Sequence, residues 1–448
     1  MKLRYLLFAG VILLAAGCKP SFQGPDAEDL DYRIRVDFCK TRDDMREYIQ
    51  KFIPDVTEEQ IDEWTANGKL ESMEIDGQRM YFRRAHTNLF LIDSACIAVK
   101  KALIDPSEYI GGILASDVAS VNSIRSYVAE SEKTGKNFVN PRYARMRHTI
   151  TVDADAVPAG ETVRCWVPFP RRDVRRQKVE LLATSEKKFR VSDIKAPHSC
   201  VYMEKKAVAG EPTVFWIEYN FDTTAEYFDL SGAKAAAYDK SSDLYKRYTC
   251  EQPPHIVFDE RMVALSDSLT KGIKNLVDKV KAIFSWISTT FPWAGSREYG
   301  TMANIPAYVL DNGHGDCGMK TLLLMTLSRI AGIPCHWESG LIDDDDCDWN
   351  MHDWCRMYFE GIGWVTVDQS YGLYEYRDVY PELTWINMGS VDHDRIVFNS
   401  EWGKPLQPAK KFARSEPVDF QKGEVEWRGG NVYFDKWHMN YEVQYINK

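Results

Sequence analysis

The chain has 448 residues, of which 44% are apolar and 27% charged, and its formal net charge at pH 7 is −10. A single hydrophobic core stops growing near roughly 250–300 residues, so this length predicts several domains. The acidic balance, together with the lack of long runs of Lys or Arg, excludes the basic surface that nucleic-acid-binding proteins use. We therefore expect no nucleic-acid partner.

The first eighteen residues have the pattern of a targeting segment. Lys2 and Arg4 precede an apolar stretch from Leu6 to Ala16, which is too short to cross a bilayer but is typical of a signal peptide. It ends in Ala15-Ala16-Gly17-Cys18 and resembles a bacterial lipobox, although Leu is commoner than Ala at position 15. The resemblance implies lipidation of Cys18; an ordinary signal peptide followed by a chance cysteine is the alternative. We predict a protein held in the bacterial cell envelope by its lipid, facing either the periplasm or the cell exterior.

Residues 19–138 are predicted to form a mainly helical domain with one hairpin, preceded by a short tether up to Glu28. Thr57 and Gln60 have the spacing of a capping box at a helix start. Asp76-Gly77 is a favoured hairpin turn between two short strands, and two further helices are expected near 87–104 and 116–132. The sequence assigns no chemistry to this domain, which we interpret as packing or partner-binding structure.

The rest of the chain predicts an α+β architecture. Residues 139–250 alternate apolar and polar positions in short segments, which favours a β-sandwich. Residues 251–400 carry a helical period from 265 to 289, a helix from Cys317 to Ile330, and strands near 335–342, 352–359 and 364–370. Residues 401–448 are expected to be a C-terminal arm packed on the core.

Cys317 is the first candidate for chemistry. It follows Gly313-His314-Gly315-Asp316 and opens an apolar helix. A cysteine in the first turn lies at the positive end of the helix dipole, which favours the nucleophilic thiolate, and its backbone N–H is free to act as an oxyanion donor. Many cysteines at helix starts are inert, so this position alone decides nothing.

His352 and Asp368 supply the partners that a nucleophilic cysteine needs. They lie on consecutive predicted strands joined around Gly361 and Gly363, and a bulge or wide loop would absorb the small offset between them. An imidazole can take the thiol proton, and a carboxylate can orient the imidazole and stabilise its charged form. A helix-start cysteine with His and Asp on neighbouring strands is the papain-like arrangement.

Residues from about 270 to 372 resemble the transglutaminase-like core. The resemblance rests on Gly315-x-Cys317, on Ala331-Gly332-Ile333-Pro334 followed by Gly340, and on His352-Asp353-Trp354 and Gly363-Trp364 leading to Asp368. It implies a papain-like fold and a Cys317–His352–Asp368 triad. The β-rich segment before it is similar to the sandwich that precedes this core in several bacterial members. The N-terminal helical region is not covered.

Several other residues leave alternatives open. Trp293 is a candidate second oxyanion donor, and packing in the core is the favoured alternative. His314 is a rival base, but it shares the nucleophile's tight turn. The acidic stretch Asp343 to Asp346, with Asp348, lacks the pattern of an EF-hand and is interpreted as a solvated loop that would favour basic substrates.

We expect a thiol enzyme that acts on amide bonds of peptides or proteins, with hydrolysis favoured over cross-linking. The alternative is a non-catalytic envelope protein that binds or assembles and keeps the fold. No metal or cofactor is expected, and the lack of a paired C-x-x-C argues against a structural zinc site. Most cysteines other than Cys18 and Cys317 are expected to be small buried residues.

Overall fold

The structure is a computed structural model that describes residues 24–343 and 349–446. The predicted signal peptide with Cys18, and the acidic stretch from Asp344 to Asp348, lie outside these residues. None of the described helices is long and apolar enough to span a membrane.

The N-terminal unit, residues 27–102, has its own small core. The predicted Thr57–Gln60 capping box is present, and Asp76 and Gly77 both have the positive φ of the expected hairpin turn. The helix predicted over 87–104 is two helices, because Asp93 accepts hydrogen bonds from the backbone N–H groups of Ala95 and Cys96 and starts the second one. The elements are α1 (Ala27–Asp37), α2 (Arg42–Ile49), α3 (Glu58–Ala66), β1 (Ser72–Ile75), β2 (Gln78–Tyr81), α4 (Ala85–Ile92) and α5 (Ser94–Ala102).

The tether predicted up to Glu28 ends slightly earlier, because α1 begins at Ala27. Asp26 caps this helix by accepting from two backbone N–H groups. The Arg33 side chain is fully buried and donates to the backbone carbonyls of Arg414 and Ser415. These partners lie about 380 residues away along the chain, so no local sequence signal marks the helix as part of the folded body.

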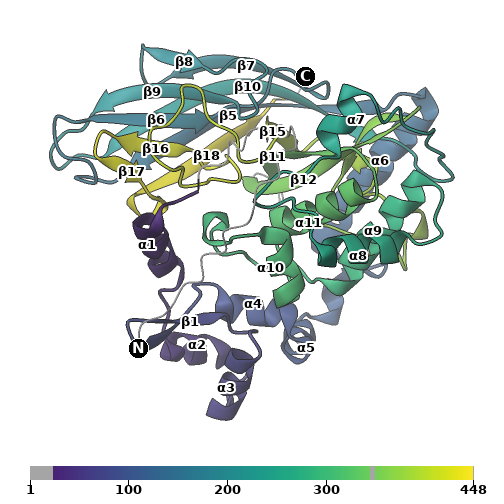
Figure 1. Cartoon of the computed structure of the whole chain (residues 1–448), viewed down its shortest axis with the longest axis horizontal. Helices are drawn as coiled ribbons and strands as arrows, with labels where there is room; N and C mark the ends of the chain where they lie inside the picture. Colours follow the sequence, from purple (N-terminus) through teal and green to yellow (C-terminus); the bar gives the residue numbers. More distant parts are fainter. Residues whose placement is uncertain (1–23, 344–348, 447–448) are drawn as a thin grey trace.

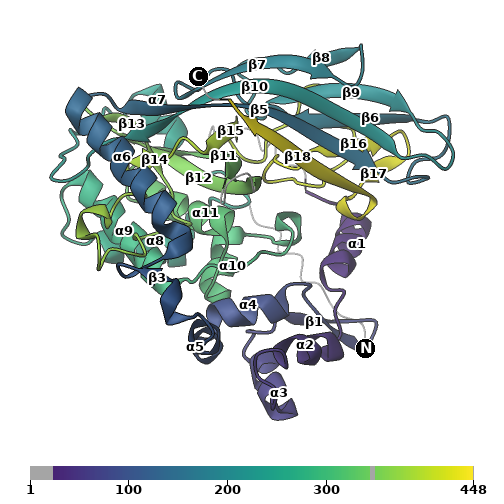
Figure 2. The same ribbon diagram turned by 180° about the vertical axis from the view of Figure 1, so that it is seen from behind.

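Two stacked sheets form the predicted β-sandwich (Figures 1 and 2). The first has the order β14-β10-β5-β18, with β7 also paired to β10, and the second has the order β17-β16-β6-β9-β8. Buried residues alternate with partly exposed ones along most of β5 and β10, as expected for strands with one face toward a core. The strands are β5 (Phe138–Val152), β6 (Thr162–Pro168), β7 (Gln177–Thr184), β8 (Phe189–Val191), β9 (Cys200–Lys206) and β10 (Thr213–Tyr227).

The C-terminal residues do more than pack on the core as an arm. They supply β16 (Glu424–Trp427), which pairs with β6, β17 (Gly430–Val432), which pairs with β16, and β18 (Trp437–Tyr445), which pairs with β5. The strands of the β5–β18 pair lie almost three hundred residues apart, so the sequence shows only a short alternating pattern for each strand and does not indicate its partner. For this reason the sequence predicts a packed arm and not strands of the sandwich. The sandwich is thus assembled from chain on both sides of the segment 251–400.

The segment from 251 to 400 forms a helical layer against a four-stranded sheet of order β13-β12-β11-β15. The helix expected over 265–289 is divided at Gly272, which has φ +77°, and Asn275 caps the second part. The Cys317–Ile330 helix is present as predicted and is buried along almost its whole length. The elements are α8 (Glu260–Thr270), α9 (Leu276–Thr290), α10 (Ile305–Asn312), α11 (Cys317–Ile330), β11 (Cys335–Asp343), β12 (Trp349–Phe359), β13 (Gly363–Val367) and β15 (Arg395–Asn399).

Connecting elements close the gaps between these units. The longest is α6 (Val118–Thr134), which leads into β5 and packs against it and β10. The others are β3 (Tyr109–Ile110), β4 (Ile113–Leu114), α7 (Asp243–Tyr248) and β14 (Ser390–Val391).

Candidate active site

Cys317 is the first residue of α11, as the sequence predicts. Asp316 caps the helix, accepting from the backbone N–H of Met319 at 3.1 Å. Just upstream, Gly315 forms a short parallel bridge with Trp293. Helix geometry leaves the Cys317 backbone N–H without an intrahelical partner, so it is placed to bind an oxyanion.

His352 and Asp368 form a buried pair. The His352 Nε2 atom is 2.7 Å from Asp368 Oδ2. No bulge interrupts β12 and β13, which are paired in one constant register up to Val367. Instead, the chain turns away after Val367, where the Asp368 N–H donates to the Asn387 carbonyl, and the Asp368 side chain reaches back to the imidazole.

Arg395 is a second partner of Asp368 that sequence analysis did not find. Its guanidinium donates to Asp368 Oδ2 from β15, and the Ser370 N–H donates to Oδ1 at 3.0 Å. Burial alone would raise the pKa of Asp368, but its interactions with His352 and with the Arg395 guanidinium outweigh burial and hold that pKa well below the usual value. The carboxylate is therefore charged and fixed, as an orienting group for His352 requires.

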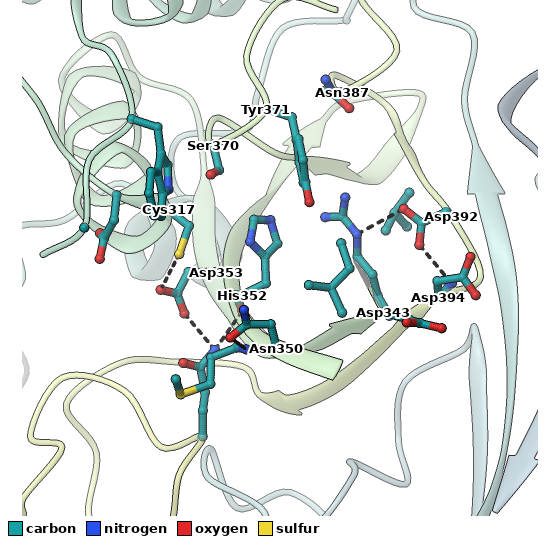
Figure 3. Close-up of a pocket in the computed structure, with 18 of the residues that line it drawn as sticks. Cys317, Asp343, Asn350, His352, Asp353, Ser370, Tyr371, Asn387, Asp392 and Asp394 are labelled. Carbon is teal, nitrogen blue, oxygen red and sulfur yellow. Dashed lines mark hydrogen bonds and ion pairs between the residues drawn. The ribbon is translucent and has the colours of Figure 1, made fainter. Parts of the chain in front are cut away.

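The Cys317 sulfur and the His352 imidazole face the same cleft (Figure 3). Since Nε2 is engaged with Asp368, Nδ1 is the nitrogen available to the thiol. In the structure the thiol donates to Asp353 Oδ2 at 3.3 Å, from the residue next to His352. His352 and its neighbour Asp353 thus present a base and a hydrogen-bond acceptor to one sulfur.

The Cys317 thiol is not in the activated state that a helix start alone favours. Burial raises its pKa well above the usual value, and the negative charges of Asp353 and Asp316 raise it further. The expectation that the helix start favours a thiolate at Cys317 is therefore not met. At rest, Cys317 is a thiol.

Asp353 belongs to a buried polar network. Tyr299 donates to Asp316 Oδ1 at 2.6 Å and lies 3.5 Å from Asp353 Oδ2. The Gln421 amide donates to Asp353 Oδ1 at 3.0 Å and to the His352 carbonyl at 2.7 Å. Gln421 comes from the C-terminal segment, so a residue beyond the family-like core positions both His352 and Asp353.

A cavity of about 1360 Å³ opens at these residues. Its walls come from the N-terminal unit, from α6, from the 293–299 and 370–376 segments, and from the C-terminal segment around 416–422. His352 lies between Trp354, with ring centroids 5.9 Å apart, and Tyr371, at 5.2 Å. The cleft is large enough for several residues of an extended peptide.

The remaining sequence candidates have different surroundings. Trp293 is 39% exposed in the cleft, so it is not a core residue as the favoured alternative had it; its role as an oxyanion donor stays a prediction. His314 is buried and its Nδ1 is 3.0 Å from the Asn312 carbonyl, which occupies one ring nitrogen of this rival base. Asp343 does not contribute to a solvated loop, because its side chain is buried and accepts from Tyr445.

The cysteines and acidic residues within 24–343 and 349–446 form no group of three suited to a metal ion. Five of the described cysteines are buried, as expected, whereas Cys39 is exposed and Cys250 and Cys317 are partly exposed.

Some site residues carried no sequence signal. Arg395, Tyr299 and Gln421 are distant from the Cys, His and Asp motifs and are brought in by tertiary packing alone. Asp353 could have been noticed, because a strand residue adjacent to a catalytic histidine lies near the same cleft.

A helix-start cysteine opposite a His–Asp pair on an antiparallel sheet defines a papain-like thiol site. Residues 263–369 match the model of the Transglutaminase-like superfamily. This range contains Cys317, His352 and Asp368, so the chain carries a transglutaminase-like core domain.

Individual relatives are more distant. The uncharacterized protein YebA of Bacillus subtilis is 26% identical over 130 residues, which are 25% of this chain and 18% of that protein. A Cytophaga hutchinsonii structure provisionally named a cysteine protease is 15% identical, with a TM-score of 0.45, over 69% of this chain and 93% of its own. The periplasmic domain of TgpA from Pseudomonas aeruginosa is 16% identical, with a TM-score of 0.28, over 55% and 91%.

Proposed function

We propose that the chain is a thiol enzyme that cleaves amide bonds of peptides or proteins through an acyl-enzyme on Cys317. The observation that carries this proposal is the His352–Asp368 pair at 2.7 Å facing the same cleft as Cys317. A merely structural histidine has no need of a buried carboxylate that is itself held by Arg395.

The reaction follows from the positions of these groups. When a substrate carbonyl enters the cleft, His352 takes the Cys317 proton through Nδ1 and the sulfur attacks the carbonyl carbon. The Cys317 N–H stabilises the oxyanion, and the imidazolium, stabilised by Asp368, returns its proton to the leaving amine. A water molecule, deprotonated by His352, then attacks the thioester and releases the carboxylic acid and the free thiol.

Hydrolysis is favoured over transfer to an amine, since water needs no binding site. A lysine acceptor would need a second site that excludes water, and no described residue group marks one. The alternative, a binding or assembly protein that keeps this fold without turnover, would leave the buried Asp368–Arg395 arrangement without a role. Together with the lipobox-like Cys18, the proposal places the enzyme at a bacterial envelope membrane, where its substrates would be envelope or imported peptides.

The test is turnover of peptides by the wild type, Cys317→Ala and His352→Ala. A digest of mixed peptides, with and without a labelled alkylamine, is followed by mass spectrometry. New fragments that disappear in both variants support hydrolysis, and peptides that gain the alkylamine mass indicate transfer. If the wild type and Cys317→Ala give the same spectra, the binding protein becomes the better description.

Simple alkylation at pH 6 would not decide the matter. The resting thiol has a raised pKa, so an enzyme of this kind would react slowly with iodoacetamide at that pH even if it is active. Trapping a thioester on Cys317 after acid quenching, in the presence of peptide only, is the matching direct readout.

A further inference from the structure

The N-terminal unit, to which the sequence assigned no chemistry, forms one wall of the active-site cleft. The Asn88 side chain donates to the Gly295 carbonyl at 2.8 Å and accepts from the Gly295 N–H at 2.9 Å. The Glu298 N–H donates to Asp37 at 2.6 Å, and Arg297 forms an ion pair with Glu71 at 3.5 Å. These contacts fix the 293–298 segment against the N-terminal unit, next to the nucleophile.

Arg84, which directly precedes α4, extends from this wall into the cleft. Its guanidinium carbon is 5.7 Å from the centroid of the Trp293 ring. On another side it lies flat on Gly295, where an added Cβ would come within 2.6 Å of Nε. The aromatic ring and the bare glycine backbone thus hold the guanidinium in one place.

No carboxylate among the described residues lies within ion-pair distance of Arg84. Its neighbour Arg83, by contrast, pairs with Asp37 at 3.2 Å. The charge of Arg84 nevertheless acts on Asp316, the residue before Cys317. Burial raises the pKa of Asp316 to about 6, and the positive charge of Arg84 lowers it in part. Arg84 is thus a positioned guanidinium with N–H donors that are not paired to a carboxylate, in the same cleft as Cys317. Such an arrangement is typical of an anion-binding subsite.

We propose that Arg84 and Trp293 form a subsite that binds a carboxylate of the peptide substrate beside the amide attacked by Cys317. The inference deepens the proposed function and rests on it for the identity of the substrate as a peptide. The carboxylate has two possible sources, an acidic side chain or a free C-terminus, and both present the same planar pair of oxygens to the guanidinium fork.

The experiment uses the Cys317→Ala chain, so that binding is measured without turnover. Binding is followed by the fluorescence polarisation of fluorescein-labelled alanine hexapeptides. In one series, a single Glu or a single Gln is placed at each position in turn and the C-terminus is an amide. In the other, all-alanine hexapeptides carry either a free or an amidated C-terminus. We expect one charged peptide of these pairs to bind about 10–100-fold tighter than its neutral partner, the range for one hydrogen-bonded charge pair. Replacing Arg84 with Gln should remove that ratio and leave the neutral peptide's affinity unchanged.

Two further variants make the result specific. Arg84→Lys keeps the charge but loses the planar fork stacked on Trp293, so most of the preference should be lost. Arg79→Gln changes an exposed arginine of the same unit outside the cleft and should keep the full ratio. Equal binding of every charged and neutral pair, or a preference that survives Arg84→Gln, would overturn the proposal.

The two proposals fail in different ways. If the wild type cleaves no peptide but the Arg84-dependent preference is present, the carboxylate subsite stands and the proposed catalysis falls. If peptides are cleaved with no dependence on charge or on Arg84, the catalysis stands and the subsite falls.

Discussion

Two carboxylates near the Cys317 sulfur set the state in which the protein rests. Asp353 accepts the thiol hydrogen bond, and Asp316 adds a second negative charge to a buried site. A thiolate formed there would be repelled by Asp316 and, once it is ionised, by Asp353, whose own pKa burial raises well above the usual value. Cys317 therefore stays a thiol in the substrate-free protein, and in the proposed mechanism its proton moves to His352 only after substrate has bound.

Removing the charge of Asp353 should make the thiol more acidic. In Asp353→Asn, the amide oxygen can still accept from Gln421, but the repulsion is gone, so the pKa of Cys317 falls. The rate at which iodoacetamide alkylates Cys317 is measured by peptide mass spectrometry from pH 6 to 10. We expect the midpoint of its rise with pH to lie about one unit lower in Asp353→Asn than in the wild type. Asp243→Asn, an exposed change in α7, serves as the control. An unchanged midpoint would mean that burial alone sets the pKa.

The Asp368–His352 contact should matter for turnover and not for binding. In Asp368→Asn, the amide cannot stabilise an imidazolium, so kcat/KM for a cleaved peptide should fall by about 100-fold or more. The affinity of the same peptide for a Cys317→Ala chain should not change when Asp368→Asn is added. Asp392→Asn removes the other carboxylate bound by Arg395 and should have a much smaller effect. Equal losses in the two variants would assign the role to Arg395 instead.

At the scale of elements, the start of α11 is packed too tightly for any side chain at its second residue. A Cβ on Gly318 would lie 2.6 Å from Asp353 Oδ2 and would also press on the Tyr299 ring. Gly318 therefore allows Tyr299 and Asp353 to close over the helix start. The sequence motif Gly-x-Cys-Gly has this second glycine for a reason of packing, not of backbone angle.

Gly318→Ala should destabilise the protein although alanine is the better helix former. Helix propensity alone would add about 1 kcal/mol of stability, but overpacking costs about 1–3 kcal/mol and displaces Asp353. The urea midpoint should fall, and the thiol should lose its hydrogen bond. Gly430→Ala is the matched control, because nothing lies within 4 Å of a Cβ there and its φ is ordinary. A higher midpoint for Gly318→Ala would show that the helix start has room.

The link between α4 and the 293–298 segment can be broken at one residue. Asn88→Ala leaves the buried Gly295 N–H and C=O without partners, at a cost of about 1–3 kcal/mol. Hydrogen exchange in residues 293–301 should become faster while exchange in α11 is unchanged. Asn312→Ala, which removes an exposed side chain bonded only to its own helix, should leave both regions as they are. No change in exchange for Asn88→Ala would mean that other contacts hold the wall.

Local elements and the three central residues could be predicted because their signals are local. The α11 boundaries follow from Asp316, Cys317 and the Gly332-x-Pro334 end, and the β12–β13 hairpin follows from its glycines. Arg395, Gln421 and the Arg84–Trp293 wall could not be predicted, since each joins segments that only the tertiary fold brings together. The same reason hid α1, whose Arg33 is anchored near residue 415.

For the whole molecule, buried titratable groups predict how stability depends on pH. Burial lowers the pKa of His148 and of His255 to about 3, and that of His198 well below its usual value. Burial raises the pKa of Glu298 to about 7 and that of Glu416 to about 8. As pH falls from 6.5 to 4.5, the histidines favour the unfolded chain, which takes up their protons, while the carboxylates favour the folded one. The two effects largely offset each other in that window.

Below about pH 4.5, Glu298 and Glu416 become protonated in both states and stop contributing, while the histidines, and below about pH 4 also the low-pKa carboxylate of Asp368, continue to favour the unfolded chain. The free energy of unfolding should then fall by about 1.4 kcal/mol per pH unit for each buried histidine until their folded pKa values are reached. Urea unfolding at pH 3.5 to 7 measures this. His148→Phe should reduce the slope by one histidine's share, whereas His438→Phe, an exposed change, should not. A slope that His148→Phe leaves unchanged would contradict the assignment.

The position of β18 beside β5 has a consequence for biosynthesis. Strand β5 begins at residue 138, and its partner on one side is complete only at residue 445. Throughout the synthesis of the intervening chain, a long β5 edge stays unpaired, and such edges are prone to associate with other chains. Pairing across so many residues is also slow, because a large loop must close first. The emerging polypeptide therefore needs protection from aggregation until residue 445 has been made.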